Sequence, residues 1–192
     1  MKCSRMNPAD TALFIIDMHD VVLRQMENRE EITRKCAGML RVAGLLGMSV
    51  IVTEHWVSKF GHTVPEVLEA VPEGSRVIEK VRFSACSEEV LAALRATGCR
   101  GVIVAGIEAH ICVLQTTLDL LEQGFEVFLL GDAIGSGEQS QVGTALTRME
   151  RCGAIRTGMV SAAYELMGSP DNEAFREVLK VVKSVLTPPK GQ

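Results

Sequence analysis

Short, wholly apolar runs alternate along the chain with longer stretches in which apolar residues recur every three or four positions. The runs FII, VIV and VIVA are apolar at consecutive positions, a pattern typical of strands covered on both faces in a parallel sheet. The longer stretches have the period of amphipathic helices. We predict strands at residues 11–17, 49–54, 76–80, 101–106, 125–131 and 154–158. We predict helices at about residues 31–47, 87–97, 111–123, 138–152 and 172–186.

This alternation predicts the fold class. Strands and helices in this order favour an α/β fold with a doubly wound, mostly parallel six-stranded sheet and helices on both faces, a Rossmann-like three-layer sandwich. The length suits a single domain over residues 1–192, with a core at about 11–167 and a C-terminal helix at about 172–186. Residues 54–75 break the rhythm, so we expect a long functional loop there.

Composition narrows the class of protein. A formal net charge of -4 argues against a general nucleic-acid surface, and no apolar stretch approaches the roughly 18 residues of a membrane span. The first strand begins near residue 11, which leaves no room for a signal sequence or a long transit peptide. The six cysteines lack paired CxxC spacing, which favours a reducing compartment over disulfides or a zinc site. We expect a cytoplasmic protein, with mitochondrial association left open.

Three reactive residues follow strands at one edge of the predicted sheet. Asp17 ends the first strand, Lys80 ends the third, and Cys112 follows the fourth strand after a short turn. Ligands of such sheets bind outside the carboxyl ends of the strands, so we expect the three side chains to converge. An ammonium and a helix N-terminus favour a thiolate, while a buried carboxylate can accept and return the thiol proton. Cys112 is therefore expected to be a nucleophile with a pKa below about 7.5.

Each of these residues also has a purely structural interpretation. Asp17 could cap a turn, Lys80 could face solvent, and Cys112 could pack as a small apolar side chain. The coincidence of all three at the expected strand ends is what favours the catalytic interpretation.

Four segments carry a resemblance to a known family: TALFIIDMHD, VTEHWVSKFGHTVPEV, VIEKVRFSAC and GIEAHICVLQTTLDLLEQGFEVFLLGDAIGS. They resemble the isochorismatase-like cysteine hydrolases, a superfamily that includes nicotinamidases and N-carbamoylsarcosine amidases. Within it, the chain looks most like the isochorismatase domain-containing proteins of unassigned substrate. The resemblance extends from about Thr11 to Met167, and GIEAHICVLQT is its most specific stretch.

The resemblance implies a catalytic triad at Asp17, Lys80 and Cys112. It also implies a non-proline cis peptide bond between Ile107 and Glu108. The backbone N–H groups of Glu108 and Cys112 would then form an oxyanion hole.

Two departures from the family pattern limit the chemistry. Nicotinamidases bind a metal through an Asp-x-His pair and a further His, but His55 and Val57 stand at the positions of that pair. We therefore predict no metal and no other cofactor, which argues against nicotinamidase activity. True isochorismatases lack the cysteine nucleophile, so the presence of Cys112 argues against the reaction that gives the family its name.

Residues near these segments are candidates for the substrate pocket: His55, Trp56, Phe60 and His110. Trp56 is a lid candidate because a lone tryptophan in a polar loop needs a burial partner. His110 has an alternative role as a structural histidine. Asp132, which follows the fifth strand, is expected to cap a helix or turn.

The function predicted from these residues is a cofactor-free cysteine hydrolase that cleaves a small amide or related acyl substrate through a thioester. A catalytically silent binding protein on the same fold is one alternative, and a ribonuclease is a less favoured one. A nucleotide-binding oxidoreductase is disfavoured because DMHDVV lacks the glycine-rich fingerprint. We expect a small-molecule substrate, no nucleic acid and no membrane. We also expect a homo-oligomer, because FREVLKVVKSVL has apolar positions that need a partner chain or the sheet's own face.

Overall fold

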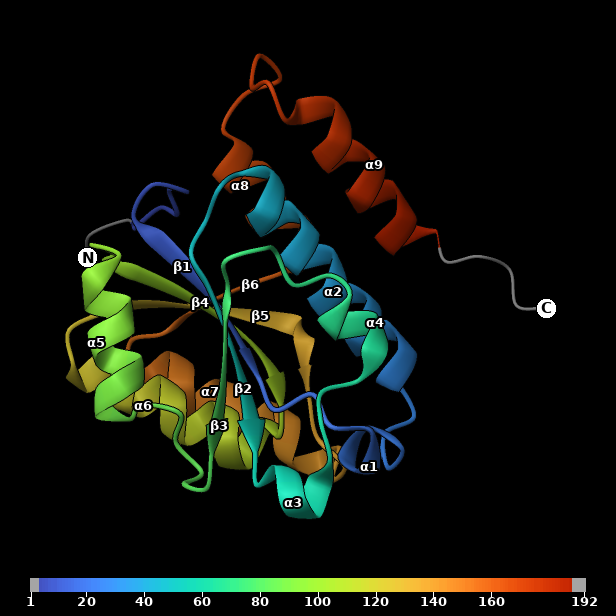
Figure 1. Cartoon of the computed structure of the whole chain (residues 1–192), viewed down its shortest axis with the longest axis vertical. Helices are drawn as coiled ribbons and strands as arrows, with labels where there is room; N and C mark the ends of the chain where they lie inside the picture. The colour runs from blue at the N-terminus through green and yellow to red at the C-terminus, as the bar shows by residue number, and fades with distance from the viewer. Residues whose placement is uncertain (1–3, 188–192) are drawn as a thin grey trace.

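One parallel sheet organises the part of the chain that the computed structural model describes, residues 4–187 (Figure 1). Within it, six strands lie in the order β3-β2-β1-β4-β5-β6, and each neighbouring pair is parallel. The strands are β1 (Thr11–Ile16), β2 (Val50–His55), β3 (Arg76–Lys80), β4 (Gly101–Ile107), β5 (Glu126–Gly135) and β6 (Ile155–Thr157). The predicted α/β fold is confirmed, and the described sheet is parallel throughout.

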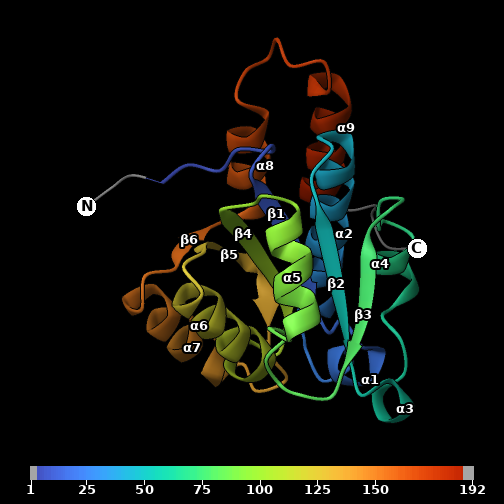
Figure 2. The same cartoon turned by 60° about the vertical axis from the view of Figure 1, so that its left-hand side comes forward.

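Helices cover both faces of this sheet (Figures 1 and 2). The helical segments are α1 (Asp20–Leu23), α2 (Arg29–Leu45), α3 (Val57–Phe60), α4 (Pro65–Leu68), α5 (Glu88–Ala96), the π-helical turn η1 (Ala109–Val113), α6 (Leu114–Glu122), α7 (Ser140–Arg151), α8 (Met159–Met167) and α9 (Phe175–Leu186). One apolar core lies between the sheet and α2, α4, α8 and α9. A second lies between the opposite face and α5, η1, α6 and α7.

The consecutive apolar positions of β1 follow from this three-layer arrangement. Leu13 and Ile15 enter the core beneath α2, whereas Phe14 and Ile16 enter the core beneath α5 and α6. Since successive side chains of a strand point to opposite faces, a central strand must be apolar at every position. The edge strand β3 differs, because Ile78 is buried while Val77 is 47% exposed.

The prediction that residues 54–75 form a loop was wrong. This segment completes β2 and contains the two single-turn helices α3 and α4. Helices of four residues are too short to show a helical period in the sequence. The prediction also missed α8, and it ended the fifth strand at residue 131 although β5 continues to Gly135.

The apolar face of α9 is covered within the same chain. Val178, Val182 and Val185 are buried in the core that α2 and α8 also line, and α9 lies along α2 in Figure 1. A Cβ atom at Gly38 of α2 would lie 2.5 Å from Val185 Cγ2, so the two helices pack closely. This helix therefore no longer argues for a second subunit, and the expected homo-oligomer stays a prediction.

Within residues 4–187, none of the helices has both the length and the apolar composition required to cross a bilayer.

Candidate active site

Asp17 leaves the carboxyl end of β1, at the centre of the sheet. Its backbone adopts a left-handed conformation with φ of 53°, which turns the chain out of the strand. Its N–H donates to the carbonyl of Thr53, and its Oδ1 atom accepts a hydrogen bond of 2.8 Å from the Thr53 hydroxyl. The residue is only 3% exposed, so this carboxylate is fixed in the sheet's edge rather than free in a surface turn.

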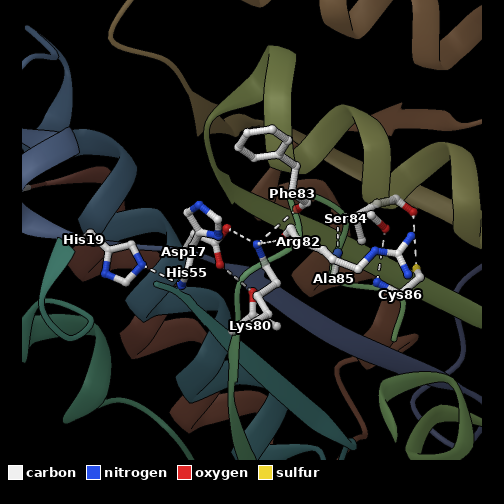
Figure 3. Close-up of polar contacts among 11 residues, drawn as sticks. Asp17, His19, His55, Lys80, Arg82, Phe83, Ser84, Ala85 and Cys86 are labelled. Carbon is white, nitrogen blue, oxygen red and sulfur yellow. Dashed lines mark hydrogen bonds and ion pairs between the residues drawn. The ribbon is translucent and has the colours of Figure 1, made fainter. Parts of the chain in front are cut away.

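Lys80 ends β3 and brings its ammonium to the same carboxylate (Figure 3). Its Nζ atom lies 2.6 Å from Asp17 Oδ2, and both side chains are less than a tenth exposed. Nζ also donates to the carbonyl oxygens of Arg82 at 3.1 Å and Phe83 at 3.0 Å. An ammonium has three N–H donors, so these three acceptors match its capacity, and Lys80 does not face solvent.

Cys112 lies in η1, the π-helical turn that follows β4. Its side chain is buried and lines a small cavity together with Asp17. The charges of Asp17 and Lys80 have opposite effects on the pKa of the thiol: the carboxylate disfavours the thiolate and the ammonium favours it. The structure thus brings together the carboxylate, the ammonium and the thiol that the sequence placed at separate strand ends.

The sequence led us to expect a lowered pKa for Cys112, but in the structure this pKa is raised. Burial, followed by the charge of Asp17, raises the pKa of the Cys112 thiol to about 12, although Lys80 acts in the lowering direction. Loss of solvation around a charged sulfur outweighs the attraction of an ammonium that already neutralises Asp17. The resting sulfur is therefore a neutral thiol with a carboxylate beside it.

The segment between β4 and η1 carries the backbone feature that the resemblance implies. The Ile107–Glu108 peptide bond is cis. Glu108 Oε1 accepts hydrogen bonds from the Gly137 N–H at 3.0 Å and from the Ser136 hydroxyl at 3.3 Å. An oxyanion hole formed by the backbone N–H groups of Glu108 and Cys112 stays a prediction.

The cavity over the thiol has a volume of about 120 Å³ and mostly apolar or aromatic walls. Its lining residues are Asp17, His19, Val22, His55, Phe60, Phe83, Ile107, Glu108, Ile111 and Cys112. Among the predicted pocket residues, His55 and Phe60 line this cavity, with their rings stacked at a centroid distance of 5.5 Å.

Trp56 and His110 do not line the cavity. Trp56 is 43% exposed and packs its ring edge-on against Phe60, so it covers a wall residue rather than the cavity itself. His110 Nδ1 lies 2.8 Å from the hydroxyl of Ser136. Asp132 caps α8, because its Oδ1 atom accepts the N–H of Met159 at 2.9 Å.

Sequence reasoning missed His19 and Phe83. His19 is 2% exposed, and its Nε2 atom accepts the backbone N–H of His55 at 2.8 Å, which fixes the start of the turn after β2. Burial lowers the pKa of both histidines, so both imidazoles are neutral at pH 7. His19 stands two residues after Asp17, which is the only sequence signal for its place in the cavity.

His55 and Val57 stand at the positions where nicotinamidases carry their metal-binding Asp-x-His pair. Among the residues that the structure describes, no three His, Cys, Asp or Glu side chains converge in a group that could hold a metal ion.

Comparison with known proteins now places this arrangement. A family model for the isochorismatase domain matches residues 11–159. Isochorismatase domain-containing protein 2 of Pongo abelii is 35% identical over 184 residues, which cover 93% of this chain and 86% of the relative. The structure of MAR1 ribonuclease from Caenorhabditis elegans has a TM-score of 0.91 and 34% identity, covering 98% of this chain and 95% of that chain.

The YcaC gene product of Escherichia coli, described as an octameric hydrolase of unknown specificity, has a TM-score of 0.88. It covers 98% of this chain and 93% of its own, but at 23% identity this likeness shows the fold alone. The fold, the family model and the curated relative agree: the chain belongs to the isochorismatase family.

Proposed function

We propose that the protein is a cofactor-free cysteine hydrolase of a small amide or related acyl substrate. The observation that carries the proposal is the buried pair of Lys80 Nζ and Asp17 Oδ2, 2.6 Å apart beside the Cys112 thiol. A nucleophile next to a group that can take its proton, itself oriented by a third group, is the recurring arrangement of covalent catalysis.

In the proposed reaction, the Cys112 sulfur attacks the acyl carbon while its proton passes to the Asp17 carboxylate. The resulting oxyanion accepts hydrogen bonds from the N–H groups of Glu108 and Cys112. Its collapse breaks the C–N bond, and Asp17 returns the proton to the leaving amine. Water then attacks the thioester and gives a proton to Asp17, which returns it to the sulfur as the carboxylic acid leaves.

The raised pKa of Cys112 suits this sequence of proton transfers. A thiol that is neutral at rest has to lose its proton at the moment of attack, and Asp17 is the adjacent acceptor. Lys80 balances the negative charge that moves between Asp17 and the sulfur. The small cavity and its aromatic walls favour a compact substrate.

Cys112→Ala is expected to lower turnover at least about 10³-fold, because the acyl group then has no sulfur acceptor. The purified protein is incubated with a panel of small amides. Amine release measures turnover, and intact-mass spectrometry detects a thioester adduct. Cys152→Ala is the matched control because that cysteine is exposed and does not line the cavity. Full turnover in Cys112→Ala would overturn the proposal, and a panel without any turnover or adduct would favour a binding protein instead.

Ribonuclease activity is a second candidate because a relative of 34% identity is named a ribonuclease. The structure supports it less. A groove of about 860 Å³ beside α1, α2 and α4 has four arginines in its wall, but acidic Asp20, Glu30 and Glu66 lie among them. A phosphate backbone is attracted by positive charge, which this mixture weakens. RNA cleavage that survives purification and is lost in Cys112→Ala would favour this candidate.

A further inference from the structure

The loop of residues 81–87 between β3 and α5 forms the cradle of the Lys80 ammonium. The carbonyl oxygens of Arg82 and Phe83 accept two of the hydrogen bonds of Nζ, as Figure 3 shows. These residues belong to no helix or strand. The place of the ammonium therefore depends on whatever holds this loop.

Side chains of α6 hold the loop. The Ser84 hydroxyl donates to Asp119 Oδ2 at 2.5 Å, and the backbone N–H of Ala85 donates to the Thr116 hydroxyl oxygen at 2.9 Å. The backbone N–H of Cys86 donates in turn to the Ser84 hydroxyl at 3.2 Å. Thr116 is fully buried and Ser84 is 7% exposed, so the bond between Ala85 and Thr116 is shielded from water, whereas Asp119 is half-buried.

The same helical segment carries the candidate nucleophile. Thr116 and Asp119 stand four and seven residues after Cys112, positions that place side chains along one side of a helix. The thiol and the loop that cradles the ammonium are thus fixed by one rigid element, although β3 and η1 are far apart in the chain.

We propose that Ser84, Thr116 and Asp119 are positioning residues that hold the Lys80 ammonium against Asp17 and beside Cys112. This inference rests on the proposed function. The three residues form a clamp, the "α6 clamp", that acts through the Arg82 and Phe83 carbonyls and does not touch the substrate cavity. A small displacement of the ammonium weakens its support of the charge that forms on the sulfur, because catalytic groups must be placed to within about 0.5 Å.

Thr116→Val tests the clamp directly. Valine has nearly the shape of threonine but removes the acceptor of the Ala85 N–H. Thr117→Val is the matched control: Thr117 is the next residue, equally buried, and its hydroxyl has no partner in the described part of the chain. Thr116→Ser restores the hydroxyl and is the conservative rescue.

The readout is the rate of Cys112 alkylation by iodoacetamide between pH 6 and 9, followed by peptide mass spectrometry. We expect Thr116→Val to lower the rate at least about tenfold, with Thr116→Ser and Thr117→Val within about twofold of the unaltered protein. The titratable groups that face Lys80 are Asp17 from β1, His55 from β2 and Cys112 from η1, and none of these variants replaces them.

A second pair of variants covers the case in which Thr116→Val fails to fold. Ser84→Ala removes the clamp from the loop side and should give the same loss of alkylation rate. Asp119→Asn keeps an acceptor oxygen for the Ser84 hydroxyl and should retain most of the rate. With a turned-over substrate, clamp variants should lower kcat and leave KM unchanged.

The outcomes separate this inference from the proposed function. If Cys112 of the unaltered protein shows no alkylation that depends on Asp17, the proposed function fails and takes the clamp with it. If Cys112 reacts normally but Thr116→Val and Ser84→Ala match Thr117→Val, the clamp alone is overturned.

Discussion

At the scale of single residues, the carboxylate of Asp17 interacts with both an ammonium and a thiol. Asp17 forms an ion pair with Lys80 and at the same time disfavours ionisation of Cys112. A buried thiol beside a carboxylate keeps its proton at neutral pH. This arrangement protects the sulfur from alkylation and oxidation that depend on free thiolate, because reactivity follows thiolate character.

The pH dependence of Cys112 alkylation should reveal this internal proton transfer. A thiol with a pKa of about 12 is about 10⁻⁵ thiolate at pH 7. If Asp17 accepts the proton instead of solvent, the rate with iodoacetamide should be flat between pH 6 and 9. Free cysteine shows a rise of about tenfold per pH unit below its pKa of about 8.5.

Asp17→Asn should remove the flat region and leave only a rate that rises with pH, because the thiol then has no adjacent proton acceptor. Asp20→Asn, which alters an exposed carboxylate paired with Arg24, is the control and should change nothing. A tenfold rise per pH unit already present in the unaltered protein would rule out proton transfer to Asp17.

The positions of the strand ends in the sequence predicted where the reactive groups lie more accurately than they predicted which residues line the pocket. Asp17, Lys80 and Cys112 lie at the same edge of the sheet, because the carboxyl ends of parallel strands are on one side. Trp56 and His110 are also close in sequence to residues of the site, but their side chains do not line the cavity. Side-chain direction around a turn depends on local backbone angles, such as the φ of 46° at Trp56, which no spacing rule supplies.

At the scale of elements, the contact between β1 and β4 sets the spacing of the site. Gly106 pairs with Ile16 in the sheet and has a φ of 118°, a conformation that L side chains rarely adopt. A Cβ atom at Gly106 would lie 2.2 Å from the carbonyl oxygen of Ile16, the residue before Asp17. Glycine is thus required where β4, which precedes Cys112, approaches β1, which precedes Asp17.

Gly106→Ala should lower the free energy of unfolding by about 2–5 kcal/mol, from backbone strain and from the clash with Ile16. Gly47→Ala is the matched control. Gly47 also has a positive φ, of 65°, but its Cβ would meet nothing within 4 Å, so only the backbone term of about 1 kcal/mol applies. Urea unfolding of both variants measures the difference, and equal losses would contradict the close approach of the strands.

The shortest elements that the sequence failed to predict share a physical cause. Single-turn helices such as α1, α3 and α4 have no period to detect, and isolated helices of that length are unstable. α1 and α4 form because Leu23 and Val67 pack into the core beneath α2. Tertiary contacts, not local propensity, select their conformation.

At the scale of the whole molecule, thiol burial links stability to pH. Burial raises the pKa of Cys36, Cys86 and Cys112 to about 12 in the folded protein. Above the ordinary value of about 8.5, the unfolded chain loses these protons while the folded chain keeps them. Deprotonation therefore favours the unfolded state, and stability falls as the pH rises from about 8.5 towards 12.

Each buried thiol should lower the free energy of unfolding by about 1.4 kcal/mol between pH 7.5 and 9.5. Cys36 gives the sharpest test because it is fully buried and lies outside the candidate site. In Cys36→Ala, the loss between the two pH values should be smaller by about 1.4 kcal/mol, whatever the variant's stability at pH 7.5. Urea titrations at both pH values under reducing conditions measure this, and an unchanged loss would refute the linkage.

The sequence by itself determined the layers of the fold and the edge at which reactive groups meet. Short runs of consecutive apolar residues are typical of strands buried on both faces, and parallel strands bring their carboxyl ends together. Only the tertiary structure decided how those groups interact. The pKa of Cys112, the closure of the cavity by Phe60 and Phe83, and the cradle that α6 builds for Lys80 depend on burial and on distances of a few ångströms. Residues remote in sequence set these quantities jointly, so no local pattern encodes them.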